Sequence, residues 1–492
     1  MNERKCEEQV SDRILGEEFM LRNTKPVWEC VESHKTEFFE LSDRIWGRPE
    51  ENYQEFFAFS EHRQTLALQG FTVSEALAGI PTAVMGEAGK GGPVIAILGE
   101  YDALPGLSQE AGLAEQRPLV PGGSGHGCGH NMLGSASLLA AVAVKDWLAQ
   151  AGLPGRVRYY GCPAEEGGSG KSFLVRAGAF DDVDIAICWH PSAFTGVWPA
   201  ASLACVEMEF TFHGRAAHAA VAPHLGRSAL DAVELMSVGV NYMREHMPSS
   251  ARVHYALVDG GGIAPNVVQP RAVVRHLVRA LKLNDMWGLV ERVRKIAEGA
   301  ALMTETRVEM KQLSGEANLV PNAPLEEAMH ENLLQLGGVE FDSSDMEFAR
   351  QIQRTLPPDD IRSAYGRHGL PVTAAPLSGK IYPPDGSRTD SIGSTDVGTV
   401  SWVVPTVQCL VSCYAIGTPG HSWQLVAQGK SPAAHKGIAF AAKAMAGVAA
   451  DVLSDPALLA AAKEALESYR KDNEFKNPVG PEAEPPLSMA AK

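Results

Sequence analysis

The sequence lacks the features that would tie it to nucleic acid, to a membrane or to export. Its 492 residues carry 43 lysines and arginines against 59 aspartates and glutamates, a formal net charge of −16. This balance disfavours the basic stripe of a nucleic-acid-binding surface. No run of about 20 apolar residues predicts a membrane span. The charged N-terminus also lacks the apolar core of a signal peptide.

Cysteine is scarce as well. Eight cysteines are scattered along the chain, unlike the dense spacing of a disulfide framework. We therefore expect a protein of a reducing compartment, the cytoplasm. Hydrophobic residues make up 45% of the chain, which is ordinary for a globular protein and enough to bury a large core at this length.

Short apolar runs alternate with helical patterns in the first 200 residues. Residues 94–98, 157–161 and 184–188 have the continuous apolar character of buried strands, and the segment 132–150 has the composition of a helix. This alternation predicts an α/β fold with a mostly parallel sheet flanked by helices. In such open sheets, functional groups gather beyond the carboxyl ends of the strands.

The pattern changes near residue 205, where apolar and polar side chains alternate over 206–212. Such alternation is typical of an antiparallel sheet with one wet face. Four strands and two helices predict a smaller α+β insert. Residues 355–395, which are rich in proline, glycine, serine and aspartate, predict a long surface loop. The expected parts are a catalytic domain in two pieces (1–204 and 317–476), the inserted domain (205–316) and an extended or disordered tail (477–492).

Side chains able to bind a metal follow the predicted strands. Cys128 and His130 lie in a glycine-rich segment, and a thiolate and an imidazole suit zinc and similar divalent ions. Glu165 and Glu166 follow the strand at 157–161. Since successive side chains of an extended backbone point to opposite sides, one carboxylate can bind a metal while the other faces a reacting water. Taken singly, these residues fit a buried cysteine or a solvated loop equally well.

Two histidines, His190 and His421, follow further strands, and a lone histidine there is more often structural than a ligand. Together, five candidate ligands exceed one tetrahedral site with an open position and suit two metal ions that share a water. Glu165 would take the proton of that water, and Asp102 would accept a hydrogen bond from a ligand imidazole. The candidate ligands are Cys128, His130, Glu166, His190 and His421.

In this order, these landmarks resemble the dinuclear-metal amidohydrolase and peptidase family of carboxypeptidase G, aminoacylase and the plant auxin-conjugate hydrolases. The resemblance implies a catalytic α/β domain interrupted by a lid or dimerisation domain with a four-stranded antiparallel sheet and two helices. It also implies two divalent ions per subunit, manganese or zinc before cobalt or nickel. The motifs that carry it are Asp102-Ala103-Leu104-Pro105, Cys128-Gly129-His130, Glu165-Glu166, Trp189-His190 and His421.

The resemblance further implies roles for single residues. Glu165 matches the general base, and the five candidate ligands match the metal-binding set. His218 matches a histidine that reaches the active site of the partner chain and stabilises the oxyanion, whereas without the resemblance it reads as structural. Asn266 matches a substrate-contacting asparagine and otherwise reads as a turn residue. Arg279 would grip a substrate carboxylate or be an ordinary surface charge.

The implied reaction is hydrolysis of the amide bond of p-aminobenzoyl-glutamate, a folate breakdown product, or of a similar N-acyl amino acid or dipeptide. Glu100 and Asn131 depart from the aspartates common in this branch. One alternative is a subunit that acts only as a homodimer or in a heterodimer with a paralogous chain. Another is a thiol hydrolase with Cys128 as nucleophile and His126 or His130 as base, which would leave the glutamates and later histidines without roles.

Overall fold

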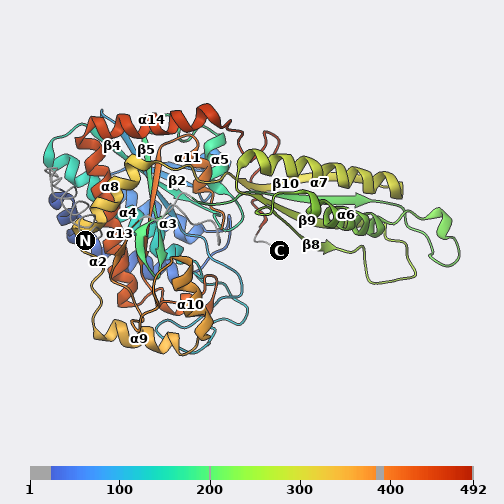
Figure 1. The fold of residues 1–492 in the computed structure, drawn as a ribbon, viewed down its shortest axis with the longest axis horizontal. Coiled ribbons are helices and arrows are strands. Elements are labelled where there is room, and N and C mark those ends of the chain that lie inside the picture. The colour runs from blue at the N-terminus through green and yellow to red at the C-terminus, as the bar shows by residue number, and fades with distance from the viewer. Residues whose placement is uncertain (1–23, 199–200, 384–392, 490–492) are drawn as a thin grey trace, which may run out of the picture.

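The computed structural model describes residues 24–198, 201–383 and 393–489. Figure 1 shows two parts, a main body and an elongated arm that extends from it. The body before the arm contains α2 (Lys25–Trp46), α3 (Phe56–Leu68), β1 (Thr72–Glu75), β2 (Val84–Lys90), β3 (Val94–Glu100), α4 (His130–Ala151), β4 (Gly155–Cys162), α5 (Gly170–Arg176), β5 (Ile185–Ser192) and β6 (Thr195–Val197).

The arm and the rest of the body follow in the chain. The arm contains β7 (Ala204–His213), α6 (Ala229–Met243), β8 (Arg252–Asp259), β9 (Arg271–Ala280), α7 (Leu283–Thr304) and β10 (Arg307–Glu316). The body then continues with α8 (Ala323–Leu336), α9 (Ser343–Gln353), α10 (Pro358–Arg367), β11 (Ile381–Tyr382), α11 (Val397–Ser401), β12 (Thr406–Ser412), α12 (Trp423–Gln428), α13 (Pro432–Ser454) and α14 (Pro456–Asp472).

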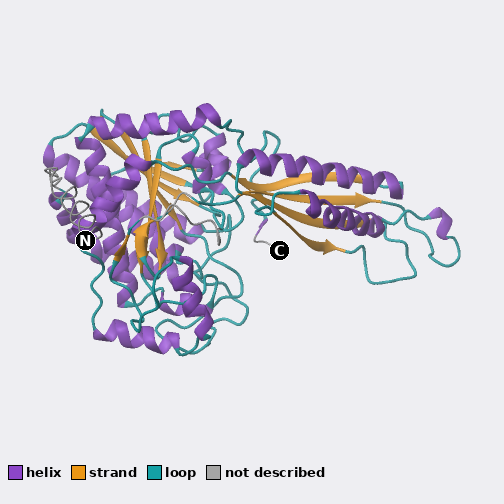
Figure 2. Cartoon of the chain, viewed as in Figure 1, coloured by secondary structure: helices purple, strands orange, loops and turns teal. Residues whose placement is uncertain are grey.

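The body is built on an eight-stranded sheet in the order β1-β2-β4-β3-β5-β12-β6-β11. Its central pairs, β4–β3, β3–β5 and β5–β12, are parallel. Every residue of β3 is buried, as expected for a strand that helices cover on both faces, and Figure 2 shows helices packed around this sheet. The predicted fold class, a mostly parallel α/β sheet interrupted by a smaller antiparallel one, is confirmed.

Two helices of the body correct the expectation that the chain lacks long apolar segments. α4 and α13 are long and apolar enough to cross a membrane by length and composition alone. However, 83% and 78% of their apolar windows are buried inside the structure. They are alanine-rich core helices, and α4 packs against both α2 and α13. Their small side chains let the helices approach one another closely.

The arm is a four-stranded antiparallel sheet in the order β10-β7-β9-β8, covered on one face by α6 and α7. The alternation predicted for β7 holds, because its apolar side chains are buried while Glu207 and Glu209 are only half-buried. β7 begins at the body with Ala204 and ends at His213, a length of ten residues. At about 3.3 Å per residue, the strand spans about 30 Å.

Residues 384–392 of the predicted long surface loop lie outside the described ranges, and the described part of that segment contains more regular structure than expected. It contains α10, which begins at Pro358 and has Asp359 and Asp360 in its first turn. A proline in the first turn and acidic residues near the N-terminus both favour a helix start. The segment also supplies β11, which pairs in parallel with β6. Composition alone suggested a loop because the same residues serve turns and helix starts.

The C-terminal tail packs on the body as far as the described residues reach. Val479 is buried, and the guanidinium of Arg176 donates hydrogen bonds to the carbonyls of Gly480 and Ala483. The last three residues of the predicted tail lie outside the described ranges. The domain bounds expected from the sequence stay a prediction.

A glycine substitution tests how closely α4 packs on β3. A Cβ at Gly134 would lie 2.5 Å from the carbonyl oxygen of Glu100 and 3.0 Å from the ring of His62. Gly134→Ala should therefore lower the stability by about 1–3 kcal/mol through overpacking, seen as a lower melting temperature in calorimetry. Gly288→Ala, in α7 with open space around the new methyl, should raise it by about 0.4–1 kcal/mol. Equal effects of the two changes would contradict this packing.

Candidate metal centre

The five candidate ligands come together at the carboxyl end of the large sheet. The ligand atoms of Cys128, His130 and His190 lie within 4.8 Å of one another, and so do those of Cys128, Glu166 and His421. Cys128 Sγ is 3.4 Å from His190 Nε2, and His421 Nε2 is 3.2 Å from Glu166 Oε1. Cys128 thus belongs to both groups, and the two groups form one continuous cluster.

Close backbone approach brings these side chains together. The amide of His421 donates a hydrogen bond of 2.9 Å to the carbonyl of Gly127. A Cβ at Gly127 would lie 3.3 Å from the Cα of His421, so a glycine lets the two loops touch. Gly129, at φ +80°, turns the chain from Cys128 into the first residue of α4, His130. His421 itself has φ +56°, a strained conformation for a non-glycine residue.

The donor set of this cluster fits a divalent ion. His130 Nε2 and Glu166 Oε1 are buried, and neither makes a hydrogen bond to any described residue. Each has one nearby group that can carry the opposite charge: Glu100 lies 3.3 Å from His130 Nε2, and His421 lies 3.2 Å from Glu166 Oε1. Unsatisfied buried polar atoms are costly, and a cation between them would satisfy both. Burial raises the pKa of the Cys128 thiol, so a thiolate there needs a cation. Thiolate, imidazole and carboxylate together suit zinc or manganese.

Asp102 lies where a supporting carboxylate was expected. Its Oδ1 is 2.8 Å from His130 Nδ1, and its Oδ2 accepts a hydrogen bond of 2.8 Å from the amide of Glu166. Both side chains of the Asp102–His130 pair are fully buried. Because Nδ1 is held by Asp102, Nε2 of His130 is the nitrogen turned toward the cluster.

A cavity of about 1280 Å³ opens beside the cluster and is lined by Glu165 together with Cys128, Glu166, His190 and His421. The Glu165 carboxylate forms a third close group with Glu100 and His130. Burial, reinforced by the charges of Glu100 and Glu166, raises the pKa of Glu165 well above its ordinary range. A carboxyl group with a raised pKa takes up and returns a proton readily, as a general acid–base requires.

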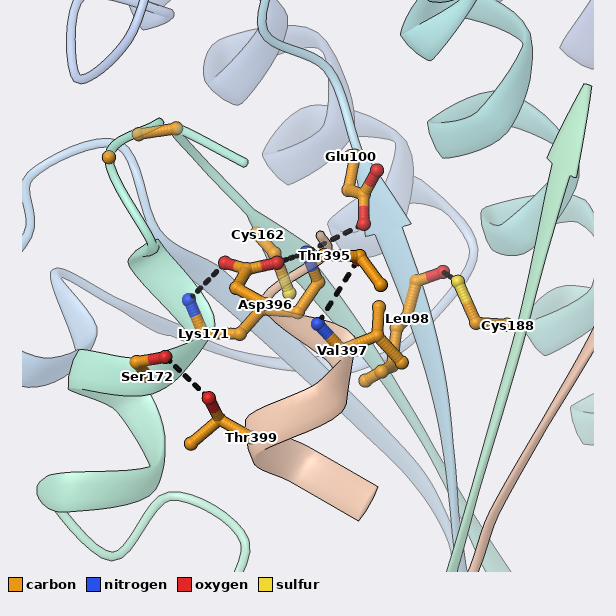
Figure 3. A network of polar contacts seen from close by, with 12 residues as sticks. Leu98, Glu100, Cys162, Lys171, Ser172, Cys188, Thr395, Asp396, Val397 and Thr399 are labelled. Carbon is orange, nitrogen blue, oxygen red and sulfur yellow. Dashed lines mark hydrogen bonds and ion pairs between the residues drawn. The ribbon is translucent and has the colours of Figure 1, made fainter. Parts of the chain in front are cut away.

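A buried lysine beneath the cluster was not foreseen from the sequence. The ammonium of Lys171, the first-turn residue of α5, lies 2.6 Å from Glu100 Oε1 and 2.5 Å from Asp396 Oδ1. The amide of Lys171 also donates to Asp396 Oδ2 at 2.8 Å. Figure 3 shows this network, including the hydroxyl contact between Ser172 and Thr399 that joins α5 to α11. The only local signal was a lysine between a glycine-rich turn and an apolar helix.

His218 and Asn266 lie apart from this cluster. Both are exposed, and they lie together at the end of the arm strands farther from the body, where the carbonyl of Asn266 accepts from the Ala219 amide at 3.0 Å. His218 Nδ1 accepts from the Ala220 and Val221 amides at 3.2 Å. Arg279, in contrast, lines the cavity and donates to Ser394 Oγ at 3.1 Å.

Comparisons with known proteins show to which family the chain belongs. Residues 96–483 match the model of peptidase family M20/M25/M40. The chain is 47% identical over 442 residues to the B subunit of the p-aminobenzoyl-glutamate hydrolase of Escherichia coli (strain K12), and the match covers 88% of this chain and 92% of that protein. It is 29% identical over 452 residues to the Xaa-Arg dipeptidase of Mus musculus, covering 89% of this chain and 90% of that one.

The fold is similar to a solved structure, the Bacillus subtilis YXEP protein, a dinuclear metal binding peptidase from M20 family. The TM-score is 0.51 at 19% identity, covering 86% of this chain and 99% of that chain. At this identity, the likeness concerns the fold.

Removing the buried ammonium should destabilise the protein. Lys171→Met leaves the carboxylates of Glu100 and Asp396 buried without a counter-charge, which should cost about 3–5 kcal/mol. The control Lys35→Met breaks the exposed 2.5 Å pair with Glu32 and should cost less than about 1 kcal/mol. Thermal melting of both variants measures the difference. A Lys171 variant as stable as the control would show that the ammonium does not balance these charges.

Proposed function

The chain belongs to the M20/M25/M40 peptidase family and is a metal-dependent amidohydrolase, and from this premise we propose that it cleaves the amide bond of p-aminobenzoyl-glutamate. The observation that carries the reaction type is the gathering of five candidate ligands in one cluster, four of which line a cavity together with Glu165. The name of the 47% identical relative supports the substrate. A second candidate is a dipeptide or other N-acyl amino acid, which the likeness to a dipeptidase supports.

Each residue of the cluster would have one task. Two divalent ions, manganese or zinc, would be held by the five ligands and would lower the pKa of a water and polarise the amide carbonyl. Glu165 accepts the proton of that water and delivers it to the leaving nitrogen. Asp102 keeps His130 in the tautomer whose Nε2 faces the other candidate ligands. The five ligands are Cys128, His130, Glu166, His190 and His421.

The position of His218 requires a second chain. In the proposed reaction, His218 stabilises the oxyanion and Asn266 contacts the substrate, yet both lie at the far end of an arm whose strands are about 30 Å long. We propose that His218 of the partner subunit reaches the cavity. β8 is one of the two edge strands of the arm sheet. It exposes Leu257 (55%) and Val258 (47%), and an exposed apolar edge strand favours pairing with another chain.

The partner is a second copy of this chain or a paralogous chain. The paralogous form has support from the 47% identical relative, whose name makes it one of the subunits of its enzyme. The A subunit of the same Escherichia coli hydrolase is 29% identical to this chain over 267 residues. Both subunits of that enzyme are therefore similar in sequence to this chain. A paralogue of this kind would present its own histidine to the cavity.

We also propose that the enzyme works in the cytoplasm. All seven cysteines of the described ranges are free, with no disulfide bond. Cys128 must stay reduced so that its thiolate can bind a metal. A reducing compartment preserves this state.

Glu165→Gln should lower kcat by at least about 100-fold, since a glutamine cannot carry the proton. The metal content should stay unchanged because Glu165 is not among the five ligands. Release of p-aminobenzoate and metal analysis measure the two quantities. As a control, a chelator should abolish the activity of the unaltered enzyme, and added Mn²⁺ or Zn²⁺ should restore it. Full turnover by the metal-loaded variant would remove Glu165 from the mechanism.

Mixing two inactive variants tests the shared site. Glu165→Gln and His218→Ala chains should each be inactive alone. A mixed dimer has one site with an intact Glu165 and an intact His218 from the other chain, so mixing and re-equilibration should restore activity. If the unaltered chain is inactive alone and gains activity with a paralogous chain, the heteromeric form is the functional one. An active monomeric chain would contradict both forms.

A further inference from the structure

The cavity around the metal centre is acidic. Among the described residues, five carboxylates line it, and the permanent positive charges in its lining come from Arg279 and Arg367 alone. The two divalent ions of the proposed function would offset the charge of the carboxylates that hold them, so a substrate carboxylate that lies away from the ions still needs another cation. The lining carboxylates are Glu100, Glu165, Glu166, Glu207 and Glu316.

Arg279 shares its charge with the arm. It lies opposite Cys205 on β7, and Cys205 lies opposite Glu316 on β10, so the three residues form one row across the sheet. The Cys205 thiol donates to Glu316 Oε1 at 2.8 Å. Burial raises the pKa of Glu316 to about 7, and the charge of Arg279 partly offsets this rise. Arg279 thus already stabilises a neighbouring carboxylate.

Arg367 differs from Arg279 in its surroundings. It is the last residue of α10, is exposed, and forms no ion pair with the residues that the structure describes. Ser363, one turn earlier, lines the same cavity, and residues four apart lie on one face of a helix. A guanidinium and a hydroxyl on this face offer several donors to one anion, and a guanidinium can hold a carboxylate bidentately.

α10 packs against two segments of the chain that lie next to candidate ligands, one after His190 and one before His421. Phe194, four residues after His190, packs against the rings of Tyr365 and His368 at centroid distances of 5.3 and 4.9 Å. On the other side, a Cβ at Gly417 would lie 2.7 Å from a side-chain carbon of Ile361, so α10 also touches the loop that leads to His421. Arg367 is thereby held at a set position relative to the metal centre.

Arg367 shares the cavity with the candidate ligands but is not one of them. It lines the same cavity as Cys128, His190 and His421, and it belongs to none of the groups of possible metal ligands. In p-aminobenzoyl-glutamate, the side-chain carboxylate is several bonds away from the amide that would be cleaved. A cation that lines the cavity without being part of the metal centre therefore suits that carboxylate.

We propose that Arg367, assisted by Ser363, binds the side-chain carboxylate of the substrate and so selects N-acyl amino acids with an acidic side chain. This inference rests on the proposed function and names the substrate class of the same site. The segment that composition predicted as a surface loop is then the specificity element of the enzyme.

The test compares two substrates that differ only in this group, p-aminobenzoyl-glutamate and p-aminobenzoyl-glutamine. The unaltered enzyme should prefer the glutamate compound. Arg367→Gln should raise its KM for that compound by about 10- to 100-fold, the loss of a charge-assisted hydrogen-bonded pair, and should change the KM for the glutamine compound by less than about twofold. Arg367→Lys should lie between, because the charge remains without the bidentate geometry.

The matched control is Arg362→Gln. Arg362 is on the same helix, pairs with Asp359 and does not line the cavity, so neither KM should change. An Arg367→Gln variant that leaves the KM for the glutamate compound unchanged, or that loses both substrates equally, would overturn the proposal. So would an unaltered enzyme that prefers the glutamine compound.

Failure of the proposed substrate is a separate outcome. If the unaltered enzyme cleaves neither p-aminobenzoyl compound but cleaves another N-acyl amino acid, the aryl part of the proposed function is wrong. The same glutamate and glutamine pair, built on the acyl group that is cleaved, then decides on Arg367 by the same criteria.

Discussion

The site depends on the balance of charge around the ammonium of Lys171. β3, β4 and β5 run parallel, and their carboxyl ends bring Glu100, Glu165 and His190 to one edge of the sheet. Carboxylates gathered in a buried place repel one another and lose their hydration. Lys171 is the one buried lysine among the described residues, and its contacts with Glu100 and Asp396 let the other acidic groups turn toward the cavity. The burial that makes the carboxylates useful therefore depends on a cation placed behind them.

The sequence predicted those parts of the site that local pattern determines. Apolar runs that end in Glu165 or His190 indicated both a strand and the position of a functional side chain at its end. The alternation in β7 indicated the antiparallel arm in the same way. Lys171 and Asp396 escaped prediction because they are 225 residues apart and acquire their meaning only where α5 meets the start of α11. No periodicity within either segment reports on such a contact.

The arm holds His218 and Asn266 away from the metal-ligand cluster of the same chain. The loop with His218 and the loop with Asn266 are tied together by backbone hydrogen bonds, so the two groups form a unit that is structurally independent of the metal centre. A rigid strand of ten residues keeps this unit away from its own cavity. Under the proposed function, completing the site requires association, and the exposed edge strand β8 favours pairing with another chain. Assembly and activity would then depend on the same surface.

Reaction type and substrate choice belong to different parts of this cavity. The candidate ligands lie at the edge of the sheet, with His130 at the start of α4 and His190 in β5. Hydrogen bonds such as that between His421 and Gly127 fix the loops that carry the others. Under the proposed function, changes there would alter the chemistry itself. Arg367 is carried by α10, a short helix within a segment that lies outside the central strands. Because Phe194 and Gly417 join α10 to the loops of His190 and His421, the helix can differ in sequence while keeping its distance from the centre. An acidic protein can thus bind an anionic substrate, since the cation that selects the substrate is separate from the lysine that stabilises the fold.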